Sequence, residues 1–207
     1  MTATLIATVH VVDDDASVLT ALTRILKSEG LAVVPSQSTR EFLQRYDPGV
    51  PNCILLDLAM PEMGGLETQQ LLEQQGIGSP VIFLTGCGDV PTTVRAMKAG
   101  AIDFLTKPVE VDALLDAVHR GLERDLRARE EHEDESRVGV LFTTLTPRER
   151  EVLRYVLAGR LNKQIAAELG IVEKTIKVHR ARVMHKLGVR SVADLVRLAE
   201  RAHVTPA

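Results

Sequence analysis

The sequence has few aromatic residues, two cysteines and no long apolar run, and each scarcity excludes a class of protein. Aromatic residues make up 3% of the 207 residues and Trp is missing, which argues against a stacking platform for single-stranded nucleic acid. No apolar run approaches the ~20 residues of a membrane helix, and residues 1–12, without Lys or Arg, do not resemble a signal peptide. Cys53 and Cys87 form no Cys-x-x-Cys pair, so neither a disulfide framework nor a zinc site is indicated. We therefore expect a cytoplasmic protein with no membrane partner.

Charge is divided unevenly along the chain, although the formal total is −3. Residues 1–120 carry 8 Lys and Arg against 15 Asp and Glu, and residues 121–137 carry 4 against 7. Residues 138–207 carry 13 against 6, so this C-terminal third is strongly basic. A basic unit of this kind indicates a polyanionic partner, usually nucleic acid, with a merely solvated basic face as the alternative.

Residues 8–120 alternate short apolar, β-branched runs with segments of helical spacing. Strands that alternate with helices pair in parallel through right-handed crossovers. Their continuous apolar character is typical of strands covered by helices on both faces. We therefore predict an α/β fold with a five-stranded, doubly wound parallel sheet, whose strands are Thr8–Val12, Leu31–Pro35, Cys53–Leu56, Val81–Leu84 and Ile102–Leu105.

Polar residues follow these strands at the carboxyl ends, where doubly wound sheets collect their functional groups. In chain order they are Asp13, Asp14, Asp15, Asp57, Thr85 and Lys107. Converging carboxylates repel each other unless a cation lies among them, and a hard divalent ion such as Mg²⁺ suits oxygen ligands. Asp57 could then attack phosphorus, with Lys107 offsetting its charge. For one Asp alone a turn or helix cap is the commoner role, and Asp15 with Ser17 fits it.

These motifs resemble the receiver domain of bacterial two-component response regulators over residues 8–120. The matching segments are Val11–Asp15, Leu55–Pro61, Leu84–Gly86 and Phe104–Pro108. The resemblance implies that Asp57 accepts a phosphoryl group from a sensor histidine kinase. It implies that Mg²⁺ binds Asp14 and Asp57 directly, Asp13 through water and Ala59 through its carbonyl. It also implies a cis Lys107–Pro108 bond.

The same resemblance implies a switch near the phosphoryl group. Thr85 and Phe104 would form the switch pair, and Lys107 would contact the phosphoryl group, altering the surface of about residues 91–120. Phe104 stands where many receivers have Tyr, so switching would move a ring without a hydroxyl hydrogen bond. Cys87 lies near the expected site, either as a small loop residue or as a redox sensor, and no basic neighbour favours its thiolate.

Residues 110–137 are expected to connect two folded units. Their apolar stripe gives way after Leu122 to a charged tract without Gly or Pro. Good helix formers and pairs such as Glu123–Arg127 favour a solvent-exposed helix. The self-repelling acidic run over residues 130–135 favours a flexible tether, and the two readings remain open.

The C-terminal third shows the pattern of a small all-α domain. Thr146, Pro147 and Glu149 are typical of the N-cap, first-turn and capping-box positions of a helix that ends near Ala158. Further helices are expected over Asn162–Leu169, Glu173–Leu187 and Ser191–Ala202. Two short helices around a turn with Gly170 predict a helix-turn-helix, with an ordinary helical hairpin as the alternative.

The helix expected over residues 173–187 presents a basic face. At 100° per residue its inward side holds Ile176, Val183 and Leu187. Its outward side holds Lys174, Lys177, Val178, Ala181, Arg182 and His185. In a DNA major groove, Lys and Arg suit guanine or phosphate, and small apolar groups suit thymine methyls. Arg180 lies about 40° from the inward centre, so we expect its stem to pack along the domain.

Residues 141–204 resemble the LuxR-type helix-turn-helix, and the two resemblances in this order are typical of the FixJ/NarL class. The matching segments are Leu145–Leu153, Asn162–Ala166, Thr175–His179, Lys186–Leu187 and Arg190–Ser191. The resemblance implies dimeric binding to paired half-sites, with a last helix that resembles a dimerisation helix and carries Val192, Leu195 and Val196. It implies that Lys177 and Val178 read bases, and that Lys163, Thr175, His179 and Lys186 lie near phosphates.

We therefore expect a receiver domain at residues 1–120, a charged helical linker at 121–140 and a LuxR-type DNA-binding domain at 141–207. The predicted protein is a bacterial response regulator and not an enzyme. Phosphorylation would control homodimerisation and sequence-specific binding to double-stranded promoter DNA, with activation favoured over repression and RNA polymerase as a further candidate partner. One alternative is a metal-dependent phosphatase or phosphotransferase, although no second acid–base group is evident near Asp57. The other is a phosphate-independent DNA-binding regulator whose receiver only mediates dimerisation.

Overall fold

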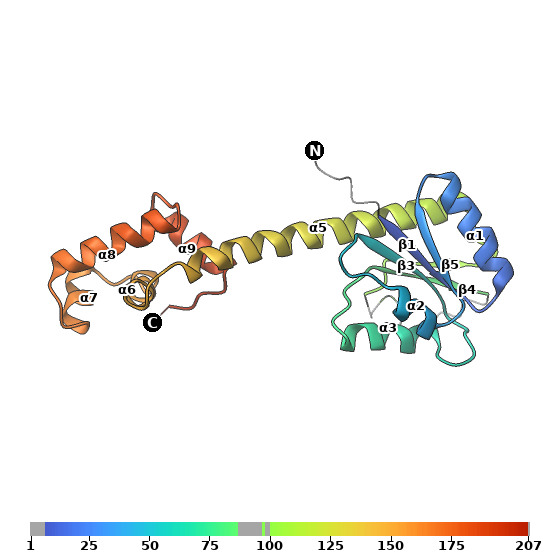
Figure 1. Ribbon diagram of the computed structural model, residues 1–207, viewed down its shortest axis with the longest axis horizontal. Coiled ribbons are helices and arrows are strands. Elements are labelled where there is room, and N and C mark those ends of the chain that lie inside the picture. Colours follow the sequence, from blue (N-terminus) through green and yellow to red (C-terminus); the bar gives the residue numbers. More distant parts are fainter. Residues whose placement is uncertain (1–6, 87–96, 98–99, 207) are drawn as a thin grey trace. The chain divides into compact units, whose positions relative to one another are not determined.

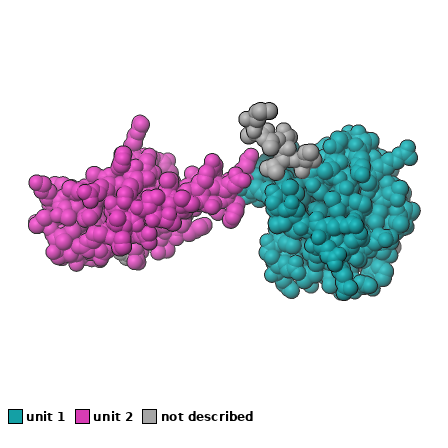
Figure 2. All heavy atoms as spheres, in the orientation of Figure 1, with its two compact units in different colours: residues 1–129 teal, residues 130–207 magenta. Residues whose placement is uncertain are grey.

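The computed structural model describes residues 7–86, 97 and 100–206. The chain divides into two compact units, Met1–Arg129 and Glu130–Ala207, which are coloured separately in Figure 2. Within the described residues, no helix is long and apolar enough to cross a membrane. Cys87, most of the segment 91–100 and the extreme N-terminus lie outside the description.

A five-stranded parallel sheet forms the core of the first unit, as predicted. Its strands are β1 (Thr8–Val12), β2 (Ala32–Ser36), β3 (Asn52–Asp57), β4 (Val81–Thr85) and β5 (Asp103–Thr106). The strand order is β2-β1-β3-β4-β5, and each predicted strand lies within one residue of its observed bounds. The buried runs of β1, β3 and β4 explain this agreement, because a strand covered on both faces leaves a continuous apolar signal in the sequence.

Helices cover both faces of this sheet (Figure 1). On one face α1 (Ala16–Ser28) and the N-terminal part of α5 (Val111–Thr143) pack on the sheet. On the other lie α2 (Thr39–Arg45) and α3 (Gly65–Gln74). Asp15 is the N-cap of α1, and its Oδ1 accepts the Ser17 N–H at 2.7 Å. The capping role therefore holds for Asp15.

Helix α5 includes the charged tract for which a helix and a tether were both considered. Its residues up to Arg129 belong to the first unit, where Leu122 and Asp125 are buried. Its residues from Glu130 belong to the second unit, where Val138 and Phe142 enter the core. The residues expected to form a linker are therefore helical, and the two units divide them.

The second unit is all-α, as predicted. After α5 it contains α6 (Pro147–Leu157), α7 (Asn162–Glu168), α8 (Glu173–Lys186) and α9 (Val192–Arg201). Thr146 caps α6, and Glu149 completes a capping box. The fully buried side chains of Leu153, Ile165 and Ile176 join these helices in one core. In α9, Leu195 is 1% exposed and belongs to this core, so it cannot contribute to an exposed dimer surface, whereas Val192 is 39% exposed.

Candidate functional site

Three carboxylates meet at the carboxyl end of the sheet. Strands β1 and β3 pair in parallel with Val12 opposite Leu56, which places the next residues, Asp13 and Asp57, side by side. Asp13 is 0% and Asp57 3% exposed, whereas Asp14 lies at the surface. Carboxylate oxygens of all three residues lie within 4.8 Å of one another. The rule that parallel strands gather their functional groups at this edge therefore holds for this chain.

Lys107 supplies one positive charge to this cluster. Its Nζ lies 2.6 Å from Asp13 Oδ2 and 2.7 Å from Asp57 Oδ1. The Lys107 N–H donates to the Thr85 carbonyl at 2.6 Å, and the Lys107–Pro108 peptide bond is cis, as expected. Burial opposes the charge on the Lys107 amine, but the hydrogen bonds to Asp13 and Asp57 outweigh it and raise its pKa.

The remaining charge fits a divalent cation. Three carboxylates and one ammonium leave two negative charges uncompensated. Burial raises the pKa of Asp13, although hydrogen bonds from Lys107 and from the Asp15 N–H oppose the rise. An oxygen-only ligand set with one exposed member suits Mg²⁺, which keeps several waters when bound. The triad of Asp13, Asp14 and Asp57 is typical of the magnesium site of receiver domains.

Main-chain groups orient the Asp57 side chain. Its Oδ2 accepts the Ala59 N–H at 2.9 Å, while Oδ1 faces Lys107. Gly65, at the start of α3, lies directly behind it: a Cβ at this position would come within 2.6 Å of the Asp57 carbonyl oxygen. Gly65 was not among the predicted site residues. The Gly64–Gly65 pair between a strand end and a helix was the signal for it, because a glycine there permits close backbone approach.

The predicted switch residues lie on the two strands beyond β3. Thr85 ends β4 and is 4% exposed. Phe104 is partly buried in β5, opposite Phe83 in the register of the two strands, and packs against the core on the α2 and α3 side. Cys87, the candidate loop residue or redox sensor, lies outside the described residues.

The second unit presents most of the expected DNA-contacting side chains to solvent. Lys163 on α7 and Lys174, Lys177, Val178 and Arg182 on α8 are exposed. Thr175 and His179 are partly buried, and His179 Nδ1 is enclosed without a hydrogen-bond partner among the described residues. Together these residues place four positive charges on one helix pair.

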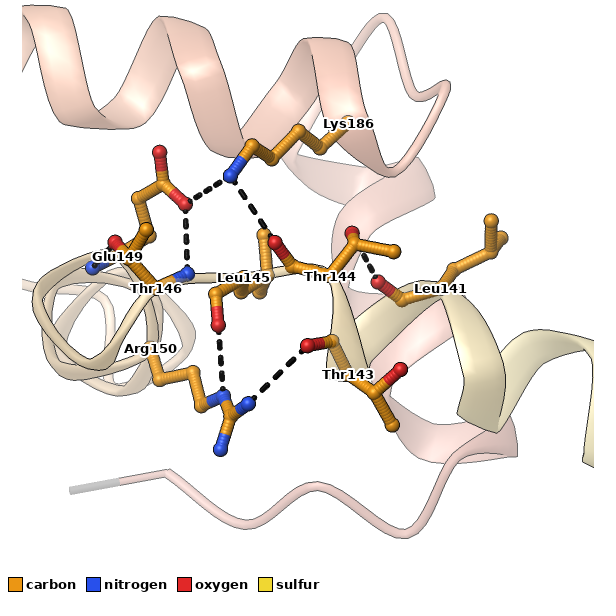
Figure 3. Close-up of polar contacts among 8 residues, drawn as sticks. All are labelled: Leu141, Thr143, Thr144, Leu145, Thr146, Glu149, Arg150 and Lys186. Atoms are coloured by element: carbon orange, nitrogen blue, oxygen red, sulfur yellow. Dashed lines mark hydrogen bonds and ion pairs between the residues drawn. The ribbon is translucent and has the colours of Figure 1, made fainter.

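Lys177, although exposed, pairs with Glu173 Oε1 on the same helix at 3.0 Å, and two other basic side chains of α8 bind residues of other helices. Arg180 Nη1 donates to Asn162 Oδ1 at 2.7 Å, which agrees with the expectation that Arg180 packs along the domain. Lys186 Nζ lies 2.6 Å from Glu149 Oε2 and 3.1 Å from the Thr144 carbonyl oxygen (Figure 3). Sequence spacing did not indicate this second contact, because Glu149 and Lys186 lie on different helices.

Comparisons with known proteins agree with the sites described in both units. Residues 9–119 match the response regulator receiver domain family, and residues 143–199 match the luxR family of bacterial regulatory proteins. The chain is 48% identical over 194 residues to nodulation protein W of Bradyrhizobium diazoefficiens, covering 94% of this chain and 86% of that protein. It is 43% identical over 193 residues to the transcriptional regulatory protein FixJ of Rhizobium meliloti, covering 93% and 94%.

A solved structure is similar over nearly the whole chain. The response regulator StyR matches with a TM-score of 0.82 and 48% identity, covering 94% of this chain and 98% of that one. Full-length FixJ from B. japonicum matches with a TM-score of 0.57 and 36% identity, covering 95% and 97%. These matches place the chain in a family of transcription regulators, so the alternative of a metal-dependent phosphatase or phosphotransferase is not supported. The chain belongs to the two-component response regulators that join a receiver domain to a LuxR-type DNA-binding domain, close to FixJ, TodT and nodulation protein W.

Proposed function

We propose that a sensor histidine kinase phosphorylates Asp57 and that this modification controls homodimerisation and sequence-specific binding to double-stranded promoter DNA. The observation that carries the proposal is the buried Asp57 carboxylate between Asp13, Asp14 and the Lys107 amine. We assign these steps to three segments, which are a receiver domain at 1–120, a linker at 121–140 and a DNA-binding domain at 141–207. The site of action would be the bacterial cytoplasm, where promoter DNA lies.

Within this proposal, the Asp57 oxygen forms a bond to phosphorus while the bond between phosphorus and the kinase histidine nitrogen breaks. The imidazole leaves with the electron pair of that bond. Asp14 and Asp57 would hold Mg²⁺ directly, Asp13 through water and Ala59 through its carbonyl. The bound ion would neutralise charge that develops on the phosphoryl oxygens. Lys107 stands 2.7 Å from Asp57 Oδ1 and is placed to pair with one of those oxygens.

The phosphoryl group would then act on the neighbouring strands. The Thr85 hydroxyl binds a phosphoryl oxygen and moves toward it, and the Phe104 ring moves into the space that Thr85 vacates. The change reaches the surface of β5 and α5. Phosphate shifts the balance between two packings only as far as it interacts differently with each of them.

The DNA-contacting role is assigned to the helix pair α7 and α8. Lys177 and Val178 read base edges in the major groove, because both are exposed near the N-terminal end of α8. Lys163, Thr175 and His179 lie near phosphates, and Lys174 and Arg182 extend the basic face. Lys186 stands at the far end of α8 with its amine held by Glu149. The exposed side of α9, with Val192, is the proposed dimer surface, and RNA polymerase is the partner through which promoters would be activated.

Intact-mass measurement with a small acyl-phosphate donor and Mg²⁺ tests the central step. The wild-type chain and Asp116→Asn, a change at an exposed α5 carboxylate, should each gain one phosphoryl group, and Asp57→Asn should gain none. Chelation of Mg²⁺ should abolish the adduct. Wild type that gains no adduct from either the donor or a histidine kinase, but still binds DNA as a dimer, would favour the phosphate-independent regulator.

A further inference from the structure

The connection between α5 and α6 is three residues long, and side chains from two other positions bind its main chain (Figure 3). Lys186 Nζ donates to the Thr144 carbonyl at 3.1 Å. Arg150 Nε donates to the Leu145 carbonyl at 3.1 Å, and its Nη2 donates to the Thr143 carbonyl at 3.2 Å. Arg150 of α6 therefore binds the last residue of α5, and Lys186 of α8 binds the residue that follows it.

The end of α5 has no cation of its own. Its last turn, Val140 to Thr143, contains no Lys or Arg. The final carbonyl groups of a helix lack intrahelical partners and carry partial negative charge, so cations nearby are favourable. Arg150 and Lys186 supply that charge from outside the helix.

Glu149 links Lys186 to the start of α6. It is 2% exposed, and its Oε2 accepts both the Thr146 N–H at 2.9 Å and Lys186 Nζ at 2.6 Å. A buried carboxylate that lost its ammonium would leave an uncompensated charge, which is strongly unfavourable. Lys186 is therefore bound more firmly than an exposed lysine such as Lys163, which forms no ion pair within the described residues.

We infer that Lys186 is a positioning residue, which fixes the C-terminal end of α8 to the start of α6 and to the connection between α5 and α6. It thereby sets the orientation in which Lys177 and Val178 meet DNA. We call Lys186, Glu149 and the Thr144 carbonyl the Lys186 clamp. The inference rests on the proposed function, but it changes the role expected for Lys186 from phosphate contact to positioning. An amine that pairs with Glu149 and Thr144 would have to break both contacts to reach a phosphate.

Salt dependence separates a phosphate contact from a positioning residue. The full-length chain, phosphorylated with an acyl-phosphate donor, is titrated with a duplex selected from a random pool by the wild type. In Lys163→Met the slope of log affinity against log salt should fall by about 1, because one phosphate contact is lost. In Lys186→Met the slope should equal that of the wild type. A slope reduced as in Lys163→Met would overturn the inference.

Sequence preference then separates positioning from simple loss of stability. Lys186→Met should lower the affinity ratio of selected to scrambled duplex by on the order of tenfold, the scale of one mismatched base pair. The double variant Glu149→Gln/Lys186→Met leaves no unpaired charge and keeps an acceptor for the Thr146 N–H. It should recover thermal stability but not the ratio. Recovery of the ratio together with stability would show that Lys186 acts through folding alone.

The clamp can also be observed without DNA. By NMR titration of the full chain, the pKa of Glu149 should rise in Lys186→Met and stay unchanged in Lys163→Met. An unchanged pKa in Lys186→Met would refute the clamp itself. If the pKa moves but the wild type prefers no duplex, the clamp exists and the proposed DNA-binding function is what fails.

Discussion

The backbone N–H of Asn52 donates to the Asp125 carboxylate at 3.0 Å, which ties the first residue of β3 to helix α5. Asp125 is 6% exposed, and the same oxygen accepts Arg129 Nε at 2.6 Å. Arg129 Nη1 in turn donates to the Pro48 carbonyl at 2.8 Å. The strand that ends in Asp57 is thus anchored at its other end by α5.

Removing this anchor should destabilise the receiver unit. Asp125→Ala leaves the Asn52 N–H and the Arg129 side chain without their acceptor, and we expect a loss of about 1–3 kcal/mol in the free energy of unfolding. Urea denaturation measures it. Asp116→Asn, which alters an exposed carboxylate on the same helix, should change stability by less than about 0.5 kcal/mol. Equal stabilities of the two variants would contradict a structural role for the Asn52–Asp125 bond.

Replacement of Lys107 should have opposite effects on metal binding and phosphorylation. Lys107→Met removes the ammonium that pairs with Asp13 and Asp57, so the carboxylate cluster becomes more negative and should bind Mg²⁺ at least about tenfold more tightly. Acyl-phosphate labelling of Asp57 should slow, because the Lys107 amine no longer pairs with the incoming phosphoryl group. Calorimetric Mg²⁺ titration and the rate of adduct formation by mass spectrometry measure the two effects. Weaker Mg²⁺ binding in the variant would be incompatible with this electrostatic account.

Gly65→Ala should disturb the Asp57 backbone. The added Cβ would lie 2.6 Å from the Asp57 carbonyl oxygen and 3.1 Å from Phe83 Cε1, closer than van der Waals contact allows. Overpacking of this kind costs about 1–3 kcal/mol, and the displaced carboxylate should accept phosphate more slowly. Thermal unfolding and phosphorylation rates check both points. Gly78→Ala is the matched control, since its Cβ would meet nothing within 4 Å.

Acid should destabilise the protein through His10. This side chain is 1% exposed between Phe42 and Tyr46, neither ring nitrogen has a hydrogen-bond partner among the described residues, and burial lowers its pKa to about 4. The pKa of a histidine in the unfolded chain is near 6.5. Between pH 6.5 and 4, His10 is therefore protonated in the unfolded chain but stays neutral in the folded chain. Stability is therefore lost as the pH falls through this range, by up to about 3 kcal/mol.

His10→Leu isolates that contribution. Above pH 7 the variant should differ little from the wild type, because the neutral imidazole makes no described hydrogen bond that leucine would forfeit. At pH 5 the variant should be the more stable of the two. Urea denaturation at a series of pH values measures the difference, and parallel stability curves for the two proteins would show that His10 does not titrate as described.

Local patterns were sufficient for most of the architecture. The five strands follow from buried apolar runs, and the start of α6 follows from Thr146, Pro147 and Glu149, because each feature involves neighbours in sequence. The meeting of Asp13 with Asp57 was also predictable, since parallel strands bring their carboxyl ends to one edge. Strand periodicity and sheet topology were enough to locate the candidate site.

Other features depended on how the helices pack. The resemblance placed Leu195 on a helix expected to dimerise, whereas packing within the core of the second unit buries it. The charged tract after Leu122 was compatible with either a helix or a tether. In the structure it is helical, Asp125 and Arg129 bind groups of the first unit, and Phe142 packs in the core of the second. Periodicity describes the direction in which a side chain points but not the group it meets there.

The sequence by itself determined the class of the protein, the order of its two domains and the carboxylates at the sheet edge. The tertiary structure alone decided that Gly65 backs Asp57, that Asp125 anchors Asn52 and that Lys186 pairs with Glu149. The physical reason is the separation along the sequence over which each interaction acts. Propensity, capping and apolar periodicity act over a few residues, whereas these contacts join groups that only the packing of separate helices and strands brings within hydrogen-bond distance.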